Sequence, residues 1–385
     1  MTKTKQNYIG WIDLLRVVAC FLVVLAHCCD PFVGQFNENY NEFLSGALWG
    51  SFLRPCVPLF VMMTGVLMFP VKMDIAAFYK KRITRIVIPL IFWSITLPIF
   101  YFLYFYFGAT TQSPSIVVDP ETMIATEHTL EATLSKLYTW IFNFNYDTTV
   151  LWYLYMLIGL YLVIPIVNVW LMQASQKDIK LVLKIWFITL FLPYVQMCAP
   201  YLGYTGNYGN TGLLGVCDWN PYGTFYYMSG FLGYILLAHY LVRFPLNWSW
   251  KKIMSVSIPM FLVGYAITAL GFIIIQKYYV DDYAYLEIFW YFSGINVFLM
   301  TFAVFIIIQN IKIGDSPFLR KLAPLAFGIF LCHFFFVQVA YDILHPILHI
   351  PAAIQIPIIA CFAALMSYIL VWIMSKSHVT QKFIM

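Results

Sequence analysis

Long apolar stretches, separated by short polar segments, follow one another along the whole chain. Ten of them are long enough to cross a membrane, because a helix of about 20 residues, at about 1.5 Å each, spans a hydrocarbon core of about 30 Å. The ten expected spans lie at about residues 11–30, 46–69, 86–107, 149–172, 181–199, 223–242, 254–276, 286–309, 323–343 and 353–374. This pattern predicts an all-α, polytopic membrane helix bundle that forms a single domain over residues 1–385.

The composition agrees with this prediction. The 385 residues are 62% hydrophobic and only 10% charged, and the mean hydropathy is +0.80, whereas a soluble domain carries about 25% charged residues. The first apolar run has spanning length and lacks a small-residue cleavage site, so we expect no signal peptide. No Gly-rich phosphate loop or nucleic-acid-binding module is visible. We therefore expect no nucleic-acid partner and expect any chemistry to be built inside the helix bundle.

The basic residues predict the orientation of the chain. Cytoplasmic loops of membrane proteins carry the excess of Lys and Arg. If the N-terminus is inside, 18 of the 22 basic residues fall on the inner side: Lys3, Lys5, Lys72, Lys80, Lys81, Arg82, Arg85, Lys177, Lys180, Lys184, Arg243, Lys251, Lys252, Lys312, Arg320, Lys321, Lys376 and Lys382. The asymmetry predicts that both termini are cytoplasmic and that the long segments 108–148 and 200–222 lie outside.

The two outer segments differ in character. In 108–148, Asp119 and Pro120 form a helix-start signal, and apolar residues then repeat at helical spacing. We interpret this segment as an amphipathic helix on the outer surface; its apolar positions are Leu130, Leu134, Leu137 and Ile141. The segment 200–222 is rich in Gly, Asn and Tyr, which suits a sugar acceptor and suits an ordinary membrane-interface loop equally.

The first span carries three ionisable residues, which are costly inside a membrane unless they have a partner or a function. Asp13 and Arg16 are spaced i, i+3 and share a helix face. Arg16 and His27 project from nearly the same side, about 16 Å apart along the helix. Arg16 suits a snorkelling anchor or a phosphate ligand, and His27 suits a helix–helix hydrogen bond or a general base. Asp30, three residues after His27, either orients the imidazole or is a solvated helix end.

Other intramembrane polar residues leave similar alternatives open. Arg54 lies in the outer half of the second span and needs a carboxylate, an aromatic face or a ligand. His333 lies near the middle of the ninth span, where it either bonds a neighbouring helix or binds substrate. Arg82 and Arg85 precede the third span as R-x-x-R, which suits positive-inside anchoring or a phosphate clamp.

The eight cysteines include no C-x-x-C pair, so we expect no metal site. Three of them, Cys20, Cys332 and Cys361, lie in apolar runs and are expected in the core. Four others lie near the predicted outer face, where the sequence leaves a disulfide open: Cys28, Cys29, Cys56 and Cys217.

Six segments, in order, resemble the motifs of acyltransferase family 3, whose members are ten-helix membrane proteins that acylate cell-surface sugars. Arg16 and His27 match the family's Arg/Lys-x10-His motif. The other segments are RPCVPLFVMMTGVLM (54–68), FYKKRITRIVIPL (78–90), LWYLYMLIGLYLVIP (151–165), FYYMSGFLGYIL (225–236) and FGIFLCH (327–333). Two positions depart from the family pattern, with Thr64 in place of Ser and Phe330 in place of Tyr. The extracytoplasmic hydrolase-like domain of some members is not seen here, so transfer is expected from the membrane domain or a separate protein.

The resemblance implies an O-acyltransferase, a multi-pass protein of the bacterial cytoplasmic membrane. The donor would be cytoplasmic acyl-CoA, most simply acetyl-CoA, and the acceptor a hydroxyl of a lipid-linked or cell-surface polysaccharide of the cell envelope. No permanently bound cofactor is expected, and the partners are the donor, the glycan acceptor and membrane lipid. Succinyl or another acyl group remains open, as does the oligomeric state.

Residue roles follow from this chemistry. Arg16, Arg82 and Arg85 are placed to bind the donor's phosphates, and the pantetheine arm would reach from them toward His27. His27 would be the general base, because imidazole titrates near neutrality, with Asp30 orienting it and Arg54 stabilising the oxyanion. We take His333, Trp152 and Tyr153 as candidate substrate-binding residues. A covalent relay through Cys28 is a weaker hypothesis, since its side chain points about 100° away from His27.

A glycan or glycolipid transporter is the alternative function. Ten helices with intramembrane charge also suit translocation. Such transporters often contain internal repeats with paired broken helices, and no convincing repeat is visible in the sequence. Turnover of labelled acyl-CoA by membranes discriminates between the two functions.

Overall fold

A computed structural model of the chain describes residues 10–107, 127–139, 145–204, 212–217, 220–279 and 283–384. Every named element in this part of the chain is a helix. Within the described residues, ten helical segments are long and apolar enough to cross a membrane, which confirms the predicted all-α bundle with ten spans. Helices satisfy their own backbone hydrogen bonds, and this is what an apolar surrounding requires.

Contacts divide the chain into two compact units. Unit 1 comprises Met1–Leu53, Lys72–Pro165 and Lys312–Met385. Its helices are α1 (Gly10–His27), α2 (Asp30–Val33), α3 (Tyr40–Phe52), α5 (Ile75–Tyr106), α7 (Leu130–Tyr138), η2 (Tyr146–Leu151), the first part of α8 (Trp152–Gln173), α15 (Pro317–Leu322), η6 (Ala323–Leu325), α16 (Ala326–Leu344), α17 (Ala352–Met374) and η7 (Thr380–Phe383).

Unit 2 comprises Arg54–Val71 and Ile166–Ile311. Its helices are α4 (Cys56–Met68), the rest of α8, α9 (Gln176–Thr189), α10 (Leu192–Cys198), η3 (Pro200–Leu202), η4 (Leu213–Gly215), η5 (Gly223–Met228), α11 (Leu232–Arg243), α12 (Trp250–Tyr278), α13 (Tyr283–Trp290) and α14 (Ile295–Asn310). Within this unit α12 packs along α14, and α11 packs along α4.

The helix α16 is central to unit 1. It packs against α1 and α17 and also contacts α5 and η2. A Cβ atom at Gly328 would lie 2.7 Å from a methyl group of Val371, so glycine allows the close approach of α16 to α17. On the other side, the Cys20 thiol of α1 donates to the Ala326 carbonyl at 3.3 Å. These contacts hold α1 and α16 side by side over the length that contains the candidate residues.

Two of the predicted spans are broken by proline. In the first span α1 ends at His27 and α2 begins at Asp30. Pro31 has no N–H to donate to the His27 carbonyl, so the helix cannot continue regularly through this point. The turn is held against α3, because a Cβ at Gly46 would lie 2.8 Å from the backbone nitrogen of Val33. In the second span α3 and α4 are separated at Leu53–Pro55.

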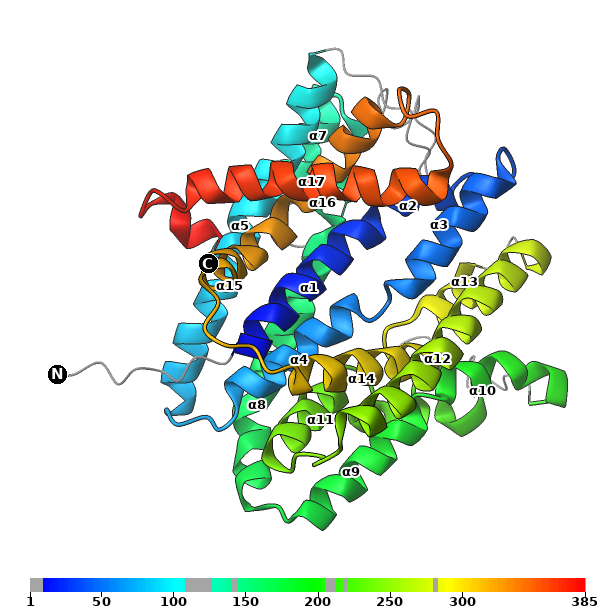
Figure 1. Cartoon of the computed structure of the whole chain (residues 1–385), viewed down its shortest axis with the longest axis vertical. Coiled ribbons are helices and arrows are strands. Elements are labelled where there is room, and N and C mark those ends of the chain that lie inside the picture. Colours follow the sequence, from blue (N-terminus) through cyan, green and yellow to red (C-terminus); the bar gives the residue numbers. More distant parts are fainter. Residues whose placement is uncertain are drawn as a thin grey trace. The chain divides into compact units, whose positions relative to one another are not determined.

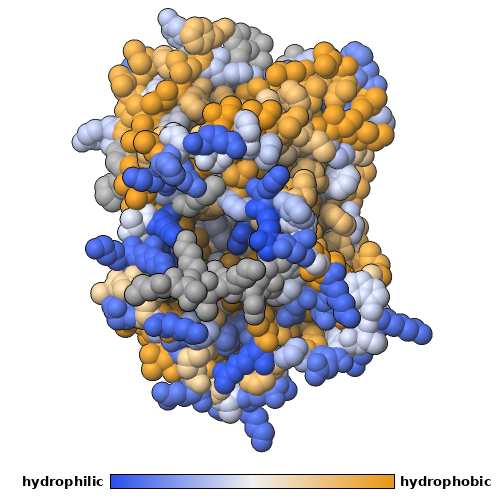
Figure 2. Space-filling view, turned by 60° about the vertical axis from the view of Figure 1, so that its left-hand side comes forward, coloured by the Kyte–Doolittle hydropathy of each residue, from blue (hydrophilic) through white to orange (hydrophobic). Residues whose placement is uncertain are grey.

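Many apolar side chains face outward, as expected for helices that contact lipid. On the face in Figure 2, hydrophobic residues (orange) cover much of the upper part and the sides, while hydrophilic residues (blue) gather in the middle and below. Cys20 and Cys332 are buried, as predicted, but Cys361 is exposed. The prediction for Cys361 was wrong because an apolar helix such as α17 contacts the bundle on one side only.

The described part of segment 108–148 contains a shorter helix than the pattern predicts. The helix α7 is capped by Thr129, whose side chain accepts from the Ala132 N–H at 3.0 Å. Its apolar residues Leu130 and Leu134 are exposed, whereas Lys136 is buried. The helix therefore exists, but its buried residues are Thr133 and Lys136 instead of the leucines. The Asp119–Pro120 signal and Ile141 lie outside the described residues, as do residues 205–211 and 218–219 of the segment 200–222.

Candidate active site

The helix α1 carries Arg16 and His27 on one continuous run from Gly10 to His27. His27 lies eleven positions after Arg16, which corresponds to about 16 Å along the axis, as the sequence predicts. The Arg16 guanidinium lies 3.3 Å from the Asp13 carboxylate, and the two side chains are 25% and 21% exposed. Arg16 is thus part-buried and already has a counter-ion on its own helix.

His27 is oriented by Asp30 across the break between α1 and α2. Its Nδ1 lies 2.8 Å from Oδ2 of Asp30. Because a carboxylate accepts hydrogen bonds, Nδ1 carries the proton in the neutral ring and Nε2 carries the lone pair. The side chains of His27 and Asp30 are 28% and 39% exposed. The pair therefore presents an oriented imidazole that can accept a proton, which is the arrangement a general base requires.

His333 of α16 lies directly beside His27. The ring centroids are 5.3 Å apart and the planes are inclined by 45°. Nδ1 of His333 donates to the Phe330 carbonyl at 2.6 Å, so its Nε2 is an acceptor. That atom is buried and has no hydrogen-bond partner among the described residues. A second acceptor nitrogen thus lies next to the first.

Aromatic rings surround the two imidazoles. Phe334 meets the His27 ring edge-on at 5.2 Å, and Phe330 lies 5.7 Å from His333. Tyr153 is 5% exposed and contacts Phe330 at 5.2 Å. Of the predicted substrate-binding residues, Tyr153 thus reaches the site through Phe330. Trp152 is half-buried and contacts the Tyr153 ring at 6.2 Å.

Arg82 and Arg85 lie near the beginning of α5, which is tied to α8 by the Tyr79 hydroxyl. That hydroxyl donates to the Leu162 carbonyl at 2.7 Å. Arg85 is exposed and Arg82 is half-buried. The Nε atom of Arg82 is buried without a hydrogen-bond partner among the described residues. An unsatisfied buried donor is costly, so this side chain is suited to an anionic ligand.

Arg16 and Arg85 lie at the same end of unit 1. Phe100 of α5 contacts Phe335 of α16 at 5.5 Å, two residues past the histidine that contacts His27. Arg85 lies fifteen residues before Phe100, or about 22 Å, and Arg16 lies about 16 Å before His27. Both helices begin at the lower end of this unit in Figure 1. The cations therefore lie at one end of the unit and the imidazoles toward the other.

Arg54 belongs to unit 2 and begins that unit after the break in the second span. Its guanidinium lies over the Trp290 ring at 3.9 Å and near the Phe292 ring at 5.7 Å. An aromatic face is one of the three kinds of partner that the sequence leaves open for this cation. A guanidinium stacked by its face still directs its N–H groups outward in the plane, and its role at an oxyanion stays a prediction.

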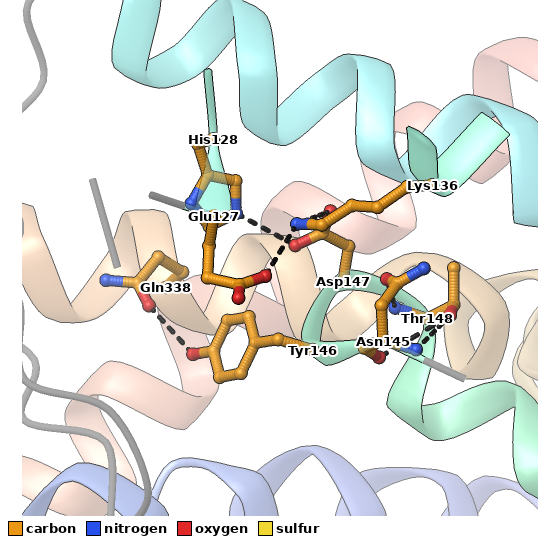
Figure 3. A network of polar contacts seen from close by, with 8 residues as sticks. All are labelled: Glu127, His128, Lys136, Asn145, Tyr146, Asp147, Thr148 and Gln338. Atoms are coloured by element: carbon orange, nitrogen blue, oxygen red, sulfur yellow. Dashed lines mark hydrogen bonds and ion pairs between the residues drawn. The ribbon is translucent and has the colours of Figure 1, made fainter. Parts of the chain in front are cut away.

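A polar network in unit 1 was not predicted from the sequence. Figure 3 shows it around η2 and α7. Asp147 binds His128 at 2.8 Å and Lys136 at 2.9 Å, and Tyr146 donates to Gln338 at 3.2 Å. The signal that could have revealed it is the N-Y-D-T segment, because Asn145 and Thr148 form a capping box that places the two residues between them at a helix start.

The cysteines form no disulfide in the structure. Cys28, the candidate for a covalent relay, is completely buried, so its thiol is not accessible in the form described. Among the described residues, no group of three or more His, Cys, Asp or Glu side chains is arranged to hold a metal ion.

Comparison with known proteins identifies the family of this chain. A family model described as an acyltransferase domain, that of acyltransferase family 3, matches residues 9–376. No curated protein and no solved structure gave a match. Since the matched region covers nearly the entire chain, the protein belongs to acyltransferase family 3.

Proposed function

We propose that this protein transfers an acyl group, most simply acetyl, from cytoplasmic acyl-CoA to a hydroxyl of a lipid-linked or cell-surface glycan in the bacterial cytoplasmic membrane. The observation that carries the proposal is the 2.8 Å contact of His27 Nδ1 with Asp30. This contact supports a tautomer with the proton on Nδ1, in which Nε2 would be available as the base. Membership of the acyltransferase family supports the reaction class.

The donor would bind with its phosphates at the end of unit 1 that carries Arg16, Arg82 and Arg85. Guanidinium groups match phosphate geometry in a bidentate manner. The buried, unpartnered Nε of Arg82 is a donor that a phosphate oxygen would satisfy. With the phosphates held there, the thioester end of the slender pantetheine arm would extend toward His27, about 16 Å away.

The reaction balances without an external proton. The acceptor hydroxyl gives its proton to His27 Nε2 while its oxygen attacks the thioester carbonyl, and a tetrahedral oxyanion forms. The oxyanion collapses, the C–S bond breaks, and the thiolate of CoA takes the proton from His27. The products are the O-acyl ester and CoA. Asp30 would hold the imidazole and stabilise its protonated form.

The remaining candidate residues would bind substrate or stabilise the oxyanion. The unpartnered Nε2 of His333 would accept a hydrogen bond from an N–H or O–H group of a substrate. Tyr153 and Trp152 would form part of the aromatic surroundings. Arg54 would stabilise the oxyanion through its in-plane N–H groups; this assignment rests on residue type and predicted membrane depth.

The experiment that tests the proposal uses membranes with and without the protein, supplied with radiolabelled acetyl-CoA. We expect label to enter membrane glycan and CoA to be released in equal amounts only when the protein is present. Movement of glycan across the membrane without incorporation of label would favour the transporter instead. Succinyl-CoA, tested in parallel, decides which acyl group is used.

A further inference from the structure

Asp147 lies at the centre of a buried ion cluster in unit 1, and the ion pairs of this cluster include neither His27 nor His333. Its two carboxylate oxygens contact His128 Nε2 at 2.8 Å and Lys136 Nζ at 2.9 Å. Lys136 also lies 3.5 Å from the Glu127 carboxylate. The side chains of His128 and Asp147 are 0% and 1% exposed. The cluster therefore joins η2 firmly to the segment that contains α7 (Figure 3).

A buried ion cluster of this kind contributes little to the net free energy of folding. Removing two charges from water costs about as much as their attraction returns, so apolar side chains of similar size would often serve stability equally well. What paired charges add is directionality, because each hydrogen bond has a narrow range of geometry. A cluster of this kind is therefore suited to positioning a neighbouring group.

That group is Tyr146, the neighbour of Asp147 in η2. The two side chains point away from one another, Asp147 toward Lys136 and Tyr146 toward Gln338 (Figure 3). The Tyr146 hydroxyl donates to Gln338 Oε1 at 3.2 Å. The Gln338 amide in turn donates to the Asp342 carboxylate at 2.9 Å, and the Tyr104 hydroxyl donates to the same carboxylate at 3.0 Å. Tyr146 is thus held at its backbone, next to Asp147, and at its hydroxyl, which bonds Gln338.

The side chain of Phe334 lies between the ring of Tyr146 and the ring of His27. Tyr146 contacts Phe334 at 5.2 Å, and Phe334 contacts the His27 ring at 5.2 Å. Tyr146, His27 and Asp30 are all only part-buried, whereas Phe334 between them is 7% exposed. Tyr146 and His27 therefore both contact Phe334, Asp30 contacts His27, and all three side chains remain partly accessible.

A second polar group, the hydroxyl of Tyr101, lies in the neighbourhood of Tyr146. Tyr101 of α5 lies 5.9 Å from the Tyr146 ring and 5.4 Å from the His128 ring. Its hydroxyl is buried and has no hydrogen-bond partner among the described residues. A buried hydroxyl without a partner is costly, and a hydroxyl-rich molecule or water beside Tyr146 would satisfy it.

We propose that Tyr146 binds the hydroxyl-bearing acyl acceptor beside His27 and that the ion cluster of Asp147, His128 and Lys136 positions Tyr146 for this contact. The proposal rests on the proposed acyl transfer and names the acceptor side of the same site. Tyr146 would touch the acceptor through its ring and hydroxyl. The three charged residues act only through Tyr146 and are positioning residues.

The test separates acceptor binding from donor binding. Purified protein is mixed with increasing amounts of membranes from cells that lack it, which supply the native acceptor, and with radiolabelled acetyl-CoA. Tyr146→Phe should raise the half-saturating amount of acceptor membranes roughly two- to tenfold, as expected for one lost hydrogen bond. Tyr146→Ala should raise it further. The KM for acetyl-CoA should stay within about twofold of the wild-type value.

Asp147→Asn tests the positioning role. It should raise acceptor half-saturation as Tyr146→Phe does, and combining the two changes should add little, because both act through the same contact. The matched controls lie on α7, where Tyr138→Phe and Glu131→Gln change exposed residues of the same types and should have no effect. If Asp147→Asn does not fold, Lys136→Met leaves the His128 contact in place and takes its role in the test.

The outcomes distinguish this proposal from the proposed function. Absence of acyl transfer by the wild-type protein would overturn the proposed function. Wild-type transfer with unchanged acceptor half-saturation in Tyr146→Ala would overturn the acceptor site alone. An equal loss of donor and acceptor affinity in Asp147→Asn, or full additivity with Tyr146→Phe, would reduce the ion cluster to a purely structural role.

Discussion

The imidazole rings of His27 and His333 lie 5.3 Å apart, and each is held through its Nδ1 atom. Asp30 accepts from the first ring and the Phe330 carbonyl accepts from the second. Both Nε2 atoms are therefore acceptors when the rings are neutral, and two acceptors cannot bond one another without a shared proton. The pair is arranged to receive a donor, as a bound hydroxyl or as a proton taken up by His27.

Replacing His27 tests the general base. His27→Ala should lower acyl transfer by about 10²–10⁴-fold, the usual effect of removing such a group. CoA binding should persist, because the cations lie about 16 Å away. Transfer and CoA affinity are measured on the same well-expressed protein. Near-normal turnover by His27→Gln, which retains a hydrogen-bonding side chain, would remove His27 from the mechanism.

Replacing Asp30 tests the orientation of the imidazole. Asp30→Asn keeps the size of the side chain but loses the charge that fixes the proton on Nδ1. We expect kcat to fall by roughly 10²–10⁴-fold with little change in the KM for the donor. The control is Glu38→Gln, which changes an exposed carboxylate eight residues after Asp30. Equal kcat values in the two variants would assign Asp30 to the solvated helix end.

The donor end is tested at α5. Arg82→Ala and Arg85→Ala should each weaken CoA binding by about 1.5–3 kcal/mol, the range for hydrogen bonds to charged groups. Lys80→Ala removes an exposed charge from the same helix and should change affinity little. Titration of the purified proteins with CoA measures the effect. If all three variants bind CoA like the wild type, the arginines serve only as membrane anchors.

Gly46 tests the support of the turn that carries Asp30. A Cβ there would lie 2.8 Å from the Val33 nitrogen and 3.0 Å from the Cys29 carbonyl oxygen, and backbone atoms cannot yield as side chains do. Gly46→Ala should lower the free energy of unfolding by about 1–3 kcal/mol and lower transfer. Gly159→Ala, whose Cβ would meet nothing within 4 Å, is the control. Thermal unfolding in detergent compares the two, and equal stability would contradict the close approach.

Cysteine labelling from outside the cell tests the predicted orientation of the chain in the membrane. In a background without the exposed Cys198 and Cys361, a cysteine at Glu131 should react with an impermeant maleimide and one at Lys177 should not. Both positions are exposed, so burial does not explain a difference between them. Labelling at Lys177 alone would reverse the orientation that the basic residues predict.

The ten spans follow from the sequence because hydropathy and helical period are local properties of the chain. The same is true of Arg16 and His27, whose spacing on one helix sets both their separation and their common face. The R-x-x-R pair at the start of α5 is equally local. These features require no knowledge of which helices are neighbours, and the structure agrees with the spans and the spacing.

The tertiary structure decided which distant residues meet. The sequence places His333 in mid-membrane but not beside His27; that contact depends on α1 packing along α16. The i, i+3 spacing makes Asp30 a candidate partner of His27, and the structure shows the contact at 2.8 Å across the break between α1 and α2. The apolar pattern of α7 predicts that its leucines are buried and Lys136 is exposed. Lys136 is buried instead, because it pairs with Asp147 eleven residues later. Charged side chains inside a membrane protein need partners. The sequence shows which residues are candidates, but the packing of the helices determines which of them come close enough to pair.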